Sequence, residues 1–295
     1  MKQGEEMSNP LISIVLPTYN GSRYLAKSVE SCLSQSYRDI ELIIVNDCST
    51  DETRAIAENY AMADSRVRII NNDTNKRLPH SLNIGFASAK GEFLTWTSDD
   101  NYYMVNAIEV MVDHLKKKPD IGLVYADMWF IDDTGDIRGY SRSVLLNGTV
   151  SDLPIYNTVG ACFMYRRAVW KVIGGYDAEK ELVEDWDYWL RVWLKFKIEH
   201  IPQGIYYYRQ HQETLTEKRF TEQQIKTIGF IKCNNMLYSD MIPDDIRCRA
   251  YLRCAGIARR LNNKALSQEC MKLALDVSDE AKEYTSKELI EYAAC

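Results

Sequence analysis

Two adjacent carboxylates, Asp99 and Asp100, follow a short apolar segment and precede Asn101. Neighbouring negative charges repel one another, and a bound cation removes that repulsion. Mg²⁺ and Mn²⁺ prefer oxygen ligands, and Mg²⁺ is usually held by one or two carboxylates together with substrate phosphates. The pair therefore indicates a metal–phosphate site. The alternative is that Asp100 or Asn101 only caps a helix predicted to start near Val105.

A second polar segment runs from Asn46 to Glu52 and contains Asp47. A carboxylate at the end of a strand can accept a hydrogen bond from a base, and uracil offers a ring N–H. The same residue types also favour an Asx turn followed by a helix N-cap. For this segment alone, the turn is the simpler interpretation.

A third group, Glu184 and Asp185, lies among aromatic residues such as Trp186. Apolar surroundings disfavour the charged form of a carboxyl group, so its pKa rises and it becomes a competent general base. Acidic residues in the first turn of a helix are also stabilised by the helix dipole alone. His211 follows an arginine at a predicted strand end, where an imidazole could bind a metal or have only a structural role.

Alternating strands and helices are predicted to position these groups. We expect strands over 11–16, 41–45, 67–70 and 92–97, with a helix over about 80–90. Such alternation favours a mostly parallel sheet with helical crossovers. Ligands of parallel sheets bind beyond the carboxyl ends of the strands. Asp47 follows the second strand and Asp99 follows the fourth, so both are expected at that edge.

The second half of the chain has a different pattern. We expect a strand over 123–131, a hairpin turn over 132–136, an apolar strand over 161–165 and a helix over 184–194. Two short strands are predicted over 198–201 and 205–208. After Thr216 the pattern is helical to the end, which predicts three or four helices.

Composition excludes several classes of protein. The formal net charge of -6 argues against nucleic acid as the main partner. Neither G-x-G-x-x-G nor G-x-x-x-x-G-K-[ST] occurs, which argues against dinucleotide-binding and P-loop proteins. The first residues lack the apolar core of a signal peptide, no segment is apolar enough to span a bilayer, and the 8 cysteines form no C-x-x-C pair. We therefore expect a cytoplasmic protein.

Four motifs occur in order along the chain: Pro17-Thr18-Tyr19-Asn20, Asn46 to Thr53, Thr97 to Asn101, and Glu184-Asp185. This series resembles the family 2 glycosyltransferases over residues 12–211, and 91–101 is similar to the spore-coat polysaccharide type, which also carries Asp-Asp-Asn. The resemblance implies the α/β GT-A fold, with a mostly parallel central sheet flanked by helices. It further implies a GT-A domain over 10–216 with a nucleotide-binding half (10–103) and an acceptor half (104–216). From the residue patterns alone we expect a disordered lead-in over 1–9 and, outside the resemblance, an α-helical C-terminal subdomain over 217–295.

The resemblance also implies roles for single residues on the donor side. Tyr19 would stack on the base, Asp47 would pair with it, Asp99 would lie near the ribose, and Arg77 would meet the phosphates, with Lys76 as its alternative. The full donor-binding set implied is Pro17, Thr18, Tyr19, Asn20, Asp47, Arg77, Asp99 and Asp100. Asp100 would bind Mn²⁺ or Mg²⁺, with His211 as an additional ligand. Asn101 stands where many members carry an aspartate.

The implied reaction is an inverting transfer from a nucleotide sugar, with UDP expected, to a saccharide or lipid-linked acceptor in surface polysaccharide synthesis. Asp185, with Glu184 beside it, would take the proton of the acceptor hydroxyl. One alternative is a sugar-phosphate nucleotidyltransferase, which expects a Gly-rich loop where Pro17 to Gly21 stand. The other is a non-catalytic nucleotide- or carbohydrate-binding subunit.

The C-terminal segment carries five arginines in a short helical stretch: Arg247, Arg249, Arg253, Arg259 and Arg260. A solvated helix face explains them most simply. The alternative is peripheral contact with an anionic surface at the inner face of the cytoplasmic membrane, where each basic residue contributes about 1 kcal/mol. The sequence does not define an oligomeric state.

Overall fold

A computed structural model describes residues 9–141, 150–212, 214–279 and 281. The predicted lead-in therefore lies outside the described residues, except for Asn9. Contacts divide the chain into two compact units. The first comprises residues 1–141, 161–176 and 196–209, and the second comprises 142–160, 177–195 and 210–295.

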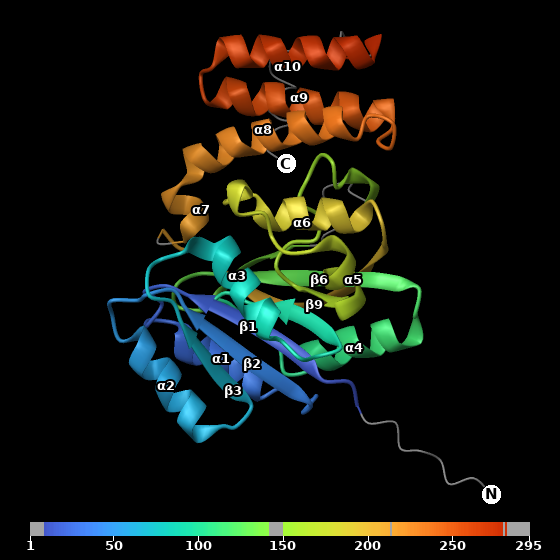
Figure 1. Cartoon of the computed structure of the whole chain (residues 1–295). Helices are drawn as coiled ribbons and strands as arrows, with labels where there is room; N and C mark the ends of the chain where they lie inside the picture. The colour runs from blue at the N-terminus through green and yellow to red at the C-terminus, as the bar shows by residue number, and fades with distance from the viewer. Residues whose placement is uncertain (1–8, 142–149, 213, 280, 282–295) are drawn as a thin grey trace, which may run out of the picture. The chain divides into compact units, whose positions relative to one another are not determined.

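One mixed β-sheet forms the centre of the first unit (Figure 1). Its hydrogen-bonded order is β3-β2-β1-β4-β8-β6-β9-β5, and β7 pairs with β6. The strands are β1 Ile12–Thr18, β2 Ile40–Asn46, β3 Val67–Asn71, β4 Phe93–Trp96, β5 Tyr102–Tyr103, β6 Ile121–Ile131, β7 Ile137–Ser141, β8 Phe163–Arg166 and β9 Lys197–Arg209. The apolar runs that predicted β1, β2 and β4 are buried, as expected for strands covered on both faces, whereas β3 at the edge of the sheet is buried only at Val67.

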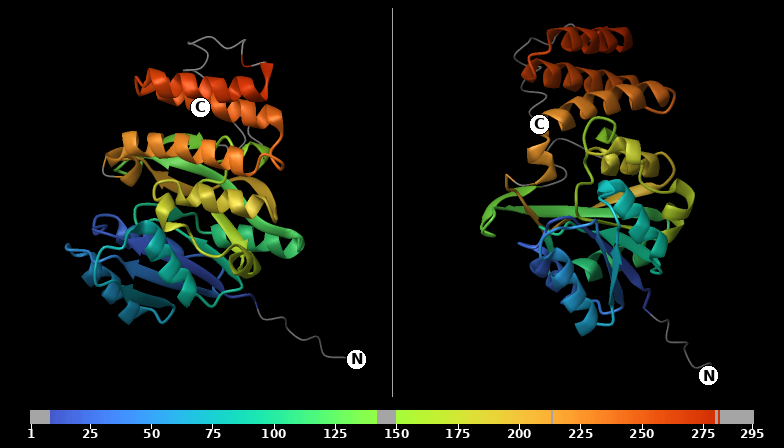
Figure 2. Two further views of the ribbon diagram at one scale, coloured as in Figure 1. Left: turned by 45° about the horizontal axis from the view of Figure 1, so that its top comes forward. Right: turned by 60° about the vertical axis from the view of Figure 1, so that its left-hand side comes forward.

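Helices cover the two faces of the sheet in the first unit (Figure 2). These helices are α1 Leu25–Leu33, α2 Thr53–Ala63, α3 Arg77–Ser88, α4 Ala107–Lys117 and α5 Arg167–Ile173. Because side chains alternate along a strand, Ile12, Ile14 and Leu16 join one core with α1 and α4. Val15 points the other way, toward α3, where only a glycine fits: a Cβ on Gly85 would lie 2.4 Å from a Val15 methyl group.

The sheet differs from the prediction in its second half. Strands β1 to β4 pair in parallel as expected, whereas β8 pairs antiparallel with both β4 and β6. The two short strands predicted near residues 198 and 205 are a single strand, β9. Ile201 and Gly204 pair with consecutive residues of β6, so Pro202 and Gln203 form a bulge that leaves the strand continuous.

The second unit contains only helices among its described elements. They are the 3-10 turns at Val150–Asp152 and Ala178–Lys180, and α6 Glu184–Trp193, α7 Leu215–Lys218, α8 Phe220–Leu237, α9 Asp244–Arg260 and α10 Lys264–Val277. Helices α9 and α10 share a small core that includes Tyr251, Leu252 and Ala274. The predicted C-terminal subdomain is helical over α8, α9 and α10 in the part of the chain that the structure describes. The second unit also includes 150–160 and 177–195, so the predicted boundary at 216/217 lies inside it.

Candidate functional site

The loops that follow β1, β2 and β4 are linked at the carboxyl ends of the parallel strands. Thr18 lies opposite Asn46 in the register of β1 and β2, and the Thr97 amide donates to the carbonyl of Val15. These pairings bring the segment after β4 alongside the end of β1. The predicted juxtaposition of the three motifs is therefore present within the first unit.

The loop after β1 is fixed by Asn20, which has a left-handed backbone (φ 53°). Its Oδ1 accepts from the Thr50 amide at 2.8 Å, and its own amide donates to Ser49 Oγ at 3.0 Å. Asn tolerates this conformation better than most residues do. These bonds leave Tyr19 on the surface with 49% of its area exposed, so its ring is available to a ligand.

Asp99 is held against the same loop. Thr18 Oγ1 donates to Asp99 Oδ2 at 2.5 Å, and a Cβ on Gly21 would lie 1.9 Å from that oxygen. Residue 21 must therefore be glycine for the loop to pass this close. Burial, reinforced by the charge of Asp100, raises the pKa of Asp99 to about 7.

The Asn101 side chain bonds the backbone at the end of β9. Asn101 is buried, and its Oδ1 accepts from the Arg209 amide at 2.7 Å. Its neutral amide therefore joins the end of β4 to the end of β9 and is committed to the backbone. Asp100, half-buried next to it, is the carboxylate of this motif that suits a cation.

A hard divalent metal fits this set of oxygen donors. The described residues contain no group of three or more His, Cys, Asp or Glu that could hold a metal alone. A metal bound at Asp100 would therefore need further oxygens from a ligand, as Mg²⁺ does when substrate phosphates complete its coordination.

Arg209 supports the Asp100 turn and was not among the predicted site residues. It is 5% exposed, its Nε donates to the Asp100 carbonyl at 3.0 Å, and its Nη1 donates to the Asp132 carbonyl at 2.6 Å. Its guanidinium also lies 4.3 Å from the ring centroid of Tyr24, a cation–π distance. An arginine at the end of a predicted strand was the available sequence signal, but its bonding partners are far away in sequence.

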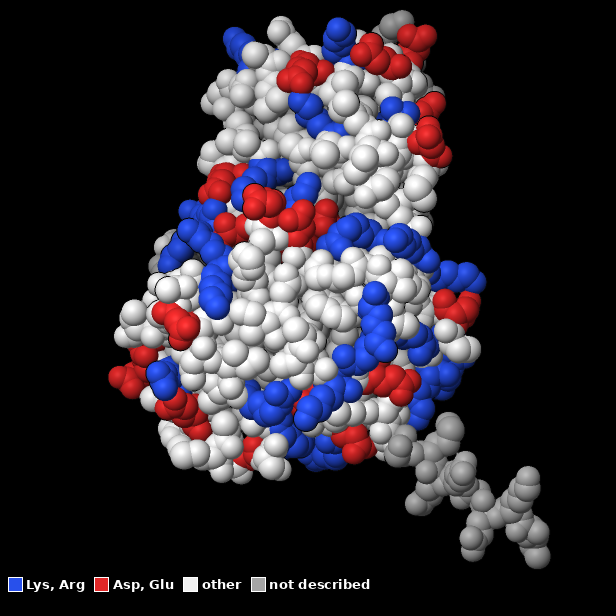
Figure 3. Space-filling view, in the orientation of Figure 1, with Lys and Arg blue, Asp and Glu red and all other residues white. Residues whose placement is uncertain are grey.

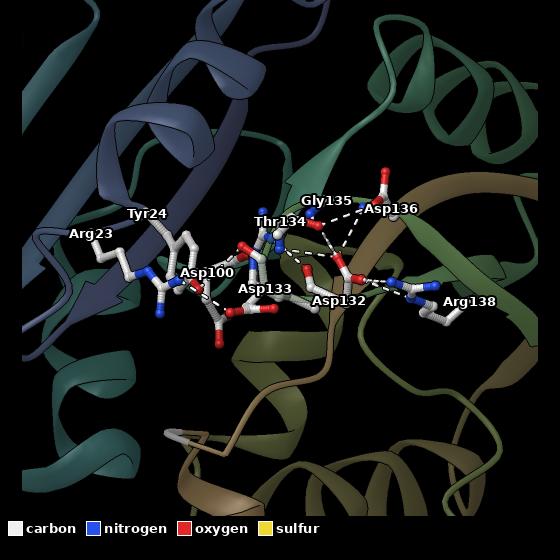
Figure 4. Close-up of polar contacts among 10 residues, drawn as sticks. Arg23, Tyr24, Asp100, Asp132, Asp133, Thr134, Gly135, Asp136 and Arg138 are labelled. Atoms are coloured by element: carbon white, nitrogen blue, oxygen red, sulfur yellow. Dashed lines mark hydrogen bonds and ion pairs between the residues drawn. The ribbon is translucent and has the colours of Figure 1, made fainter.

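The predicted hairpin turn over 132–136 is confirmed between β6 and β7 (Figure 4). Asp132 Oδ1 accepts from the amides of Thr134, Gly135 and Asp136, each at 3.0 Å. Bonds from Thr134 and Arg138 hold the pKa of Asp132 well below its usual range. Figure 4 shows this turn together with Arg23, Tyr24 and Asp100.

The hairpin turn also contacts the segment after β1. Arg23 pairs with the Asp133 carboxylate at 3.3 Å, and the Tyr24 hydroxyl donates to the Asp133 carbonyl at 3.4 Å. Both contacts are exposed, so each contributes little stability alone. They place the turn beside the segment that follows the predicted base-binding loop.

Asp47 is buried (4% exposed) and bonds the loop before α3. Its Oδ1 accepts from Asn72 Nδ2 at 2.7 Å and the Lys76 amide at 2.8 Å, while its Oδ2 accepts from the Arg77 amide at 2.8 Å. The turn expected over 46–52 is present there, since Asn46 Oδ1 accepts from the Ser49 amide at 3.1 Å and Asp51 Oδ1 accepts from the Thr53 amide at 3.0 Å. Asp47 itself instead bonds the start of α3. This explains why α3 begins at Arg77 and not near His80.

The same bonds compensate for an unusual backbone at Arg77, which has φ 70°. A left-handed conformation costs a non-glycine residue roughly 1–2 kcal/mol. A carboxylate oxygen has two acceptor positions, so one position of Asp47 Oδ2 remains beyond these three bonds. Pairing of Asp47 with a base and contact of Arg77 with phosphates stay predictions.

Glu184 and Asp185 begin α6 in the second unit. Asp185 Oδ2 accepts from Asn157 Nδ2 at 2.8 Å, and its Oδ1 accepts from the Trp186 amide at 2.7 Å. Burial raises the pKa of Asp185 despite these bonds. Burial and the charge of Asp185 raise the pKa of Glu184, whose Oε2 has no hydrogen-bond partner among the described residues.

Asn157 was not predicted, because a single asparagine in a loop carries no sequence signal for a partner 28 residues away. Asp187, the other acid of α6, is instead paired with Arg191 at 2.8 Å. His211 belongs to the second unit, two residues after Arg209, and its role as a metal ligand stays a prediction.

A family model described as glycosyl transferase family 2 matches residues 13–174. The chain is also 32% identical over 225 residues to the putative glycosyltransferase EpsE of Bacillus subtilis, which covers 72% of this chain and 78% of that protein. The chain belongs to glycosyl transferase family 2. The predicted class of enzyme is therefore confirmed, and a nucleotidyltransferase is not supported.

Solved structures show the same fold as this family 2 glycosyltransferase. TarS of S. aureus in complex with UDP-GlcNAc matches with a TM-score of 0.62 at 16% identity, over 96% of this chain and 89% of that chain. The mannosyltransferase PcManGT of Pyrobaculum calidifontis, in complex with GDP-Man and Mn²⁺, matches with a TM-score of 0.65 at 15% identity, over 99% and 90%. At these identities the likeness concerns the fold alone, and it confirms the predicted GT-A fold.

Proposed function

We propose that this glycosyltransferase takes its sugar from a UDP-sugar and transfers it with inversion to a hydroxyl group of a saccharide or lipid-linked acceptor. The 2.5 Å bond from Thr18 to Asp99 carries the donor part of the proposal. It joins the loop assigned to the base to the carboxylates assigned to ribose and metal. The bound UDP-GlcNAc in TarS and GDP-Man in PcManGT support a nucleotide-sugar donor in general.

Each of the predicted donor-binding residues would contact a different part of the nucleotide. The exposed ring of Tyr19 would stack on the base, and the remaining acceptor position of Asp47 would take one base N–H. Uracil offers one such N–H, whereas guanine presents both an N–H and an amino group. One acceptor position therefore favours UDP over GDP.

Asp100 would hold Mn²⁺ or Mg²⁺, with His211 as a second candidate ligand. A divalent metal supplies Lewis-acid stabilisation of the charge that grows on the departing diphosphate. The Mn²⁺ in PcManGT supports this choice. On the protein side, Arg209 and Asn101 hold the Asp100 turn in place.

Asp185 would act as the general base of a single displacement. Its carboxylate takes the proton of the acceptor hydroxyl, and the acceptor oxygen forms a bond to the anomeric carbon. The bond from that carbon to the diphosphate oxygen breaks, and the diphosphate leaves with the electron pair. A carboxylate with a raised pKa is suited to accept this proton near neutral pH.

A thermal-shift panel of UDP- and GDP-sugars tests the donor assignment. We expect UDP-sugars with Mn²⁺ to raise the Tm, because a ligand of the native state stabilises it, and EDTA to abolish the shift. Equal Tm shifts with GDP-sugars would contradict the assignment of uracil as the bound nucleotide base. Slow release of UDP from the stabilising donor would distinguish an enzyme from a non-catalytic binding subunit.

Surface polysaccharide synthesis at the inner face of the cytoplasmic membrane is the setting that fits these substrates. No described helix is long and apolar enough to cross a bilayer. Arg259 and Arg260, in the last turn of α9, are the arginines that we would test for membrane contact. On the face in Figure 3, acidic and basic side chains of the tail are interspersed. Salt-sensitive sedimentation with anionic liposomes, weakened by changing both arginines to Glu, would support such contact.

A further inference from the structure

Helix α9 contacts the segment 152–157. This segment lies about thirty residues before Asp185, the predicted general base. The Asp152 side chain is 4% exposed, and its Oδ1 pairs with Arg249 Nη1 at 2.9 Å. The Asp152 carbonyl accepts from the amides of Ile155 and Tyr156 at 2.8 and 2.9 Å. The segment is thus a tight turn with a buried ion pair to α9.

A second arginine of α9 reaches the other end of this turn. Arg253 Nη1 donates to the Ile155 carbonyl at 2.6 Å, and its guanidinium lies 4.6 Å from the ring centroid of Tyr156. The same guanidinium lies 5.5 Å from the ring of Trp186, the residue after Asp185. Arg253 therefore contacts both the turn and the first turn of α6.

Trp186 closes this group of contacts. Its Nε1 donates to the Leu153 carbonyl at 2.6 Å, and its ring lies 4.8 Å from that of Phe230 on α8. The tail thus contributes side chains from two helices to the structure around the start of α6. Asn157, directly after Tyr156, donates to Asp185 at 2.8 Å.

We propose that Arg253 is a positioning residue for the general base: it orders residues 155–156 so that Asn157 holds the Asp185 carboxylate. This inference rests on the proposed role of Asp185. It makes the helical tail a working part of the acceptor side of the enzyme. It also explains why the arginine at 253 is partly buried rather than solvated on a helix face.

The hydrogen bond from Asn157 determines how the loss of Arg253 would affect the pKa of Asp185. Donation from an amide N–H stabilises the charged form of Asp185 and opposes the effect of burial on its pKa. Glu184, on the same helix, is the neighbouring carboxyl group, and burial and the charge of Asp185 raise the pKa of Glu184 itself. A loosened Asn157 therefore leaves Asp185 misoriented and protonated over a wider pH range.

Replacement of Arg253 by Met keeps the length of the side chain and removes its donors. We expect R253M to lower kcat on the order of 10- to 100-fold, the scale of a small misplacement of a catalytic group. We also expect the acidic limb of the kcat–pH profile to move to higher pH, while the donor KM stays within about twofold because the donor site lies in the first unit. Arg247→Met on the same helix, where the ion pair is with Asp244, is the matched control and should match the wild type.

Asn157→Ala keeps the proposal testable should R253M fold poorly. It should move the acidic limb of the kcat–pH profile in the same direction. The double variant should be no worse than the more impaired single variant, because both changes interrupt the same series of contacts from Arg253 to Asp185. Superimposable pH profiles of wild type and N157A, with Asp185→Asn impaired, would overturn the inference and leave the proposed base intact. An unimpaired Asp185→Asn would instead overturn the proposed base itself.

Discussion

The carboxylates of the donor site and Asp185 are supported by different kinds of structure. Asp99 and Asp100 follow β4, a buried strand that pairs in parallel with β1, and they are held by Thr18 at the end of β1 and Arg209 at the end of β9. Asp185 begins a helix and depends on Asn157, in a turn held by α9. Sheet register alone brings the first group together, whereas the second is assembled from helices and a loop far apart in the chain.

This difference predicts that variants in the two regions lose different properties of the enzyme. Changes in the first unit should alter donor and metal binding, because the β1, β2 and β4 loops meet there. Changes around Asp185 should alter turnover and its pH dependence while donor binding persists. The following predictions test this division, from the largest expected effect to the smallest.

The largest effect is expected for Asp185→Asn. Removing a general base usually costs 10²–10⁴ in rate, so kcat should fall by about that factor. Asp187→Asn is the matched control on the same helix, because Asp187 pairs with Arg191 and we assign it no catalytic role. Steady-state kinetics with a saturating donor measures both. Equal losses in the two variants would mean that the wrong carboxylate carries the proton.

An intermediate effect is expected for Gly21→Ala. Its Cβ would lie 1.9 Å from Asp99 Oδ2, so the loop or the carboxylate must move. We expect UDP affinity to fall roughly tenfold, with overpacking destabilising the fold by about 1–3 kcal/mol. Gly139→Ala, whose Cβ would meet its nearest atom at an ordinary 3.6 Å, is the control. Calorimetry that shows unchanged UDP binding by G21A would separate this loop from the donor site.

The smallest effect concerns stability and pH. Burial raises the pKa of Glu184 in the folded state above that of the unfolded chain, so the folded state loses stability as pH rises from about 4.3. Glu184→Gln does not titrate and should raise the Tm at pH 8. The gain should shrink as the pH falls toward 4. A gain that is the same at all pH values would contradict a raised pKa of Glu184 in the folded state.

The sequence predicted where the motifs after β1, β2 and β4 lie, because that information is local. Each motif directly follows a strand, and parallel pairing then brings Thr18, Asp47 and Asp99 to one edge without knowledge of distant contacts. The sequence could not predict that Asp47 would cap the loop before α3, because that depends on bonds with the amides of Lys76 and Arg77. The first helical residue of α3 was misplaced for the same reason.

The residues that were missed are those with distant partners. Arg209 bonds a carbonyl 109 residues earlier, and Arg253 bonds one 98 residues earlier. Neither contact follows from a periodic pattern. The bulge at Pro202 and Gln203 similarly keeps β9 in register with β6, although the proline interrupts the strand pattern.

Titration of UDP into the wild type, Asp100→Ala and Asp185→Asn, with Mn²⁺ and with EDTA, tests the central claim that the two carboxylate sites have separate roles. Asp113→Ala, an exposed acid of α4, controls for loss of charge. We predict Mn²⁺-dependent binding by wild type, D185N and D113A at similar affinity, and loss of that binding in D100A. Binding by D100A that equals the wild type, or loss of binding in a folded D185N, would contradict the claim.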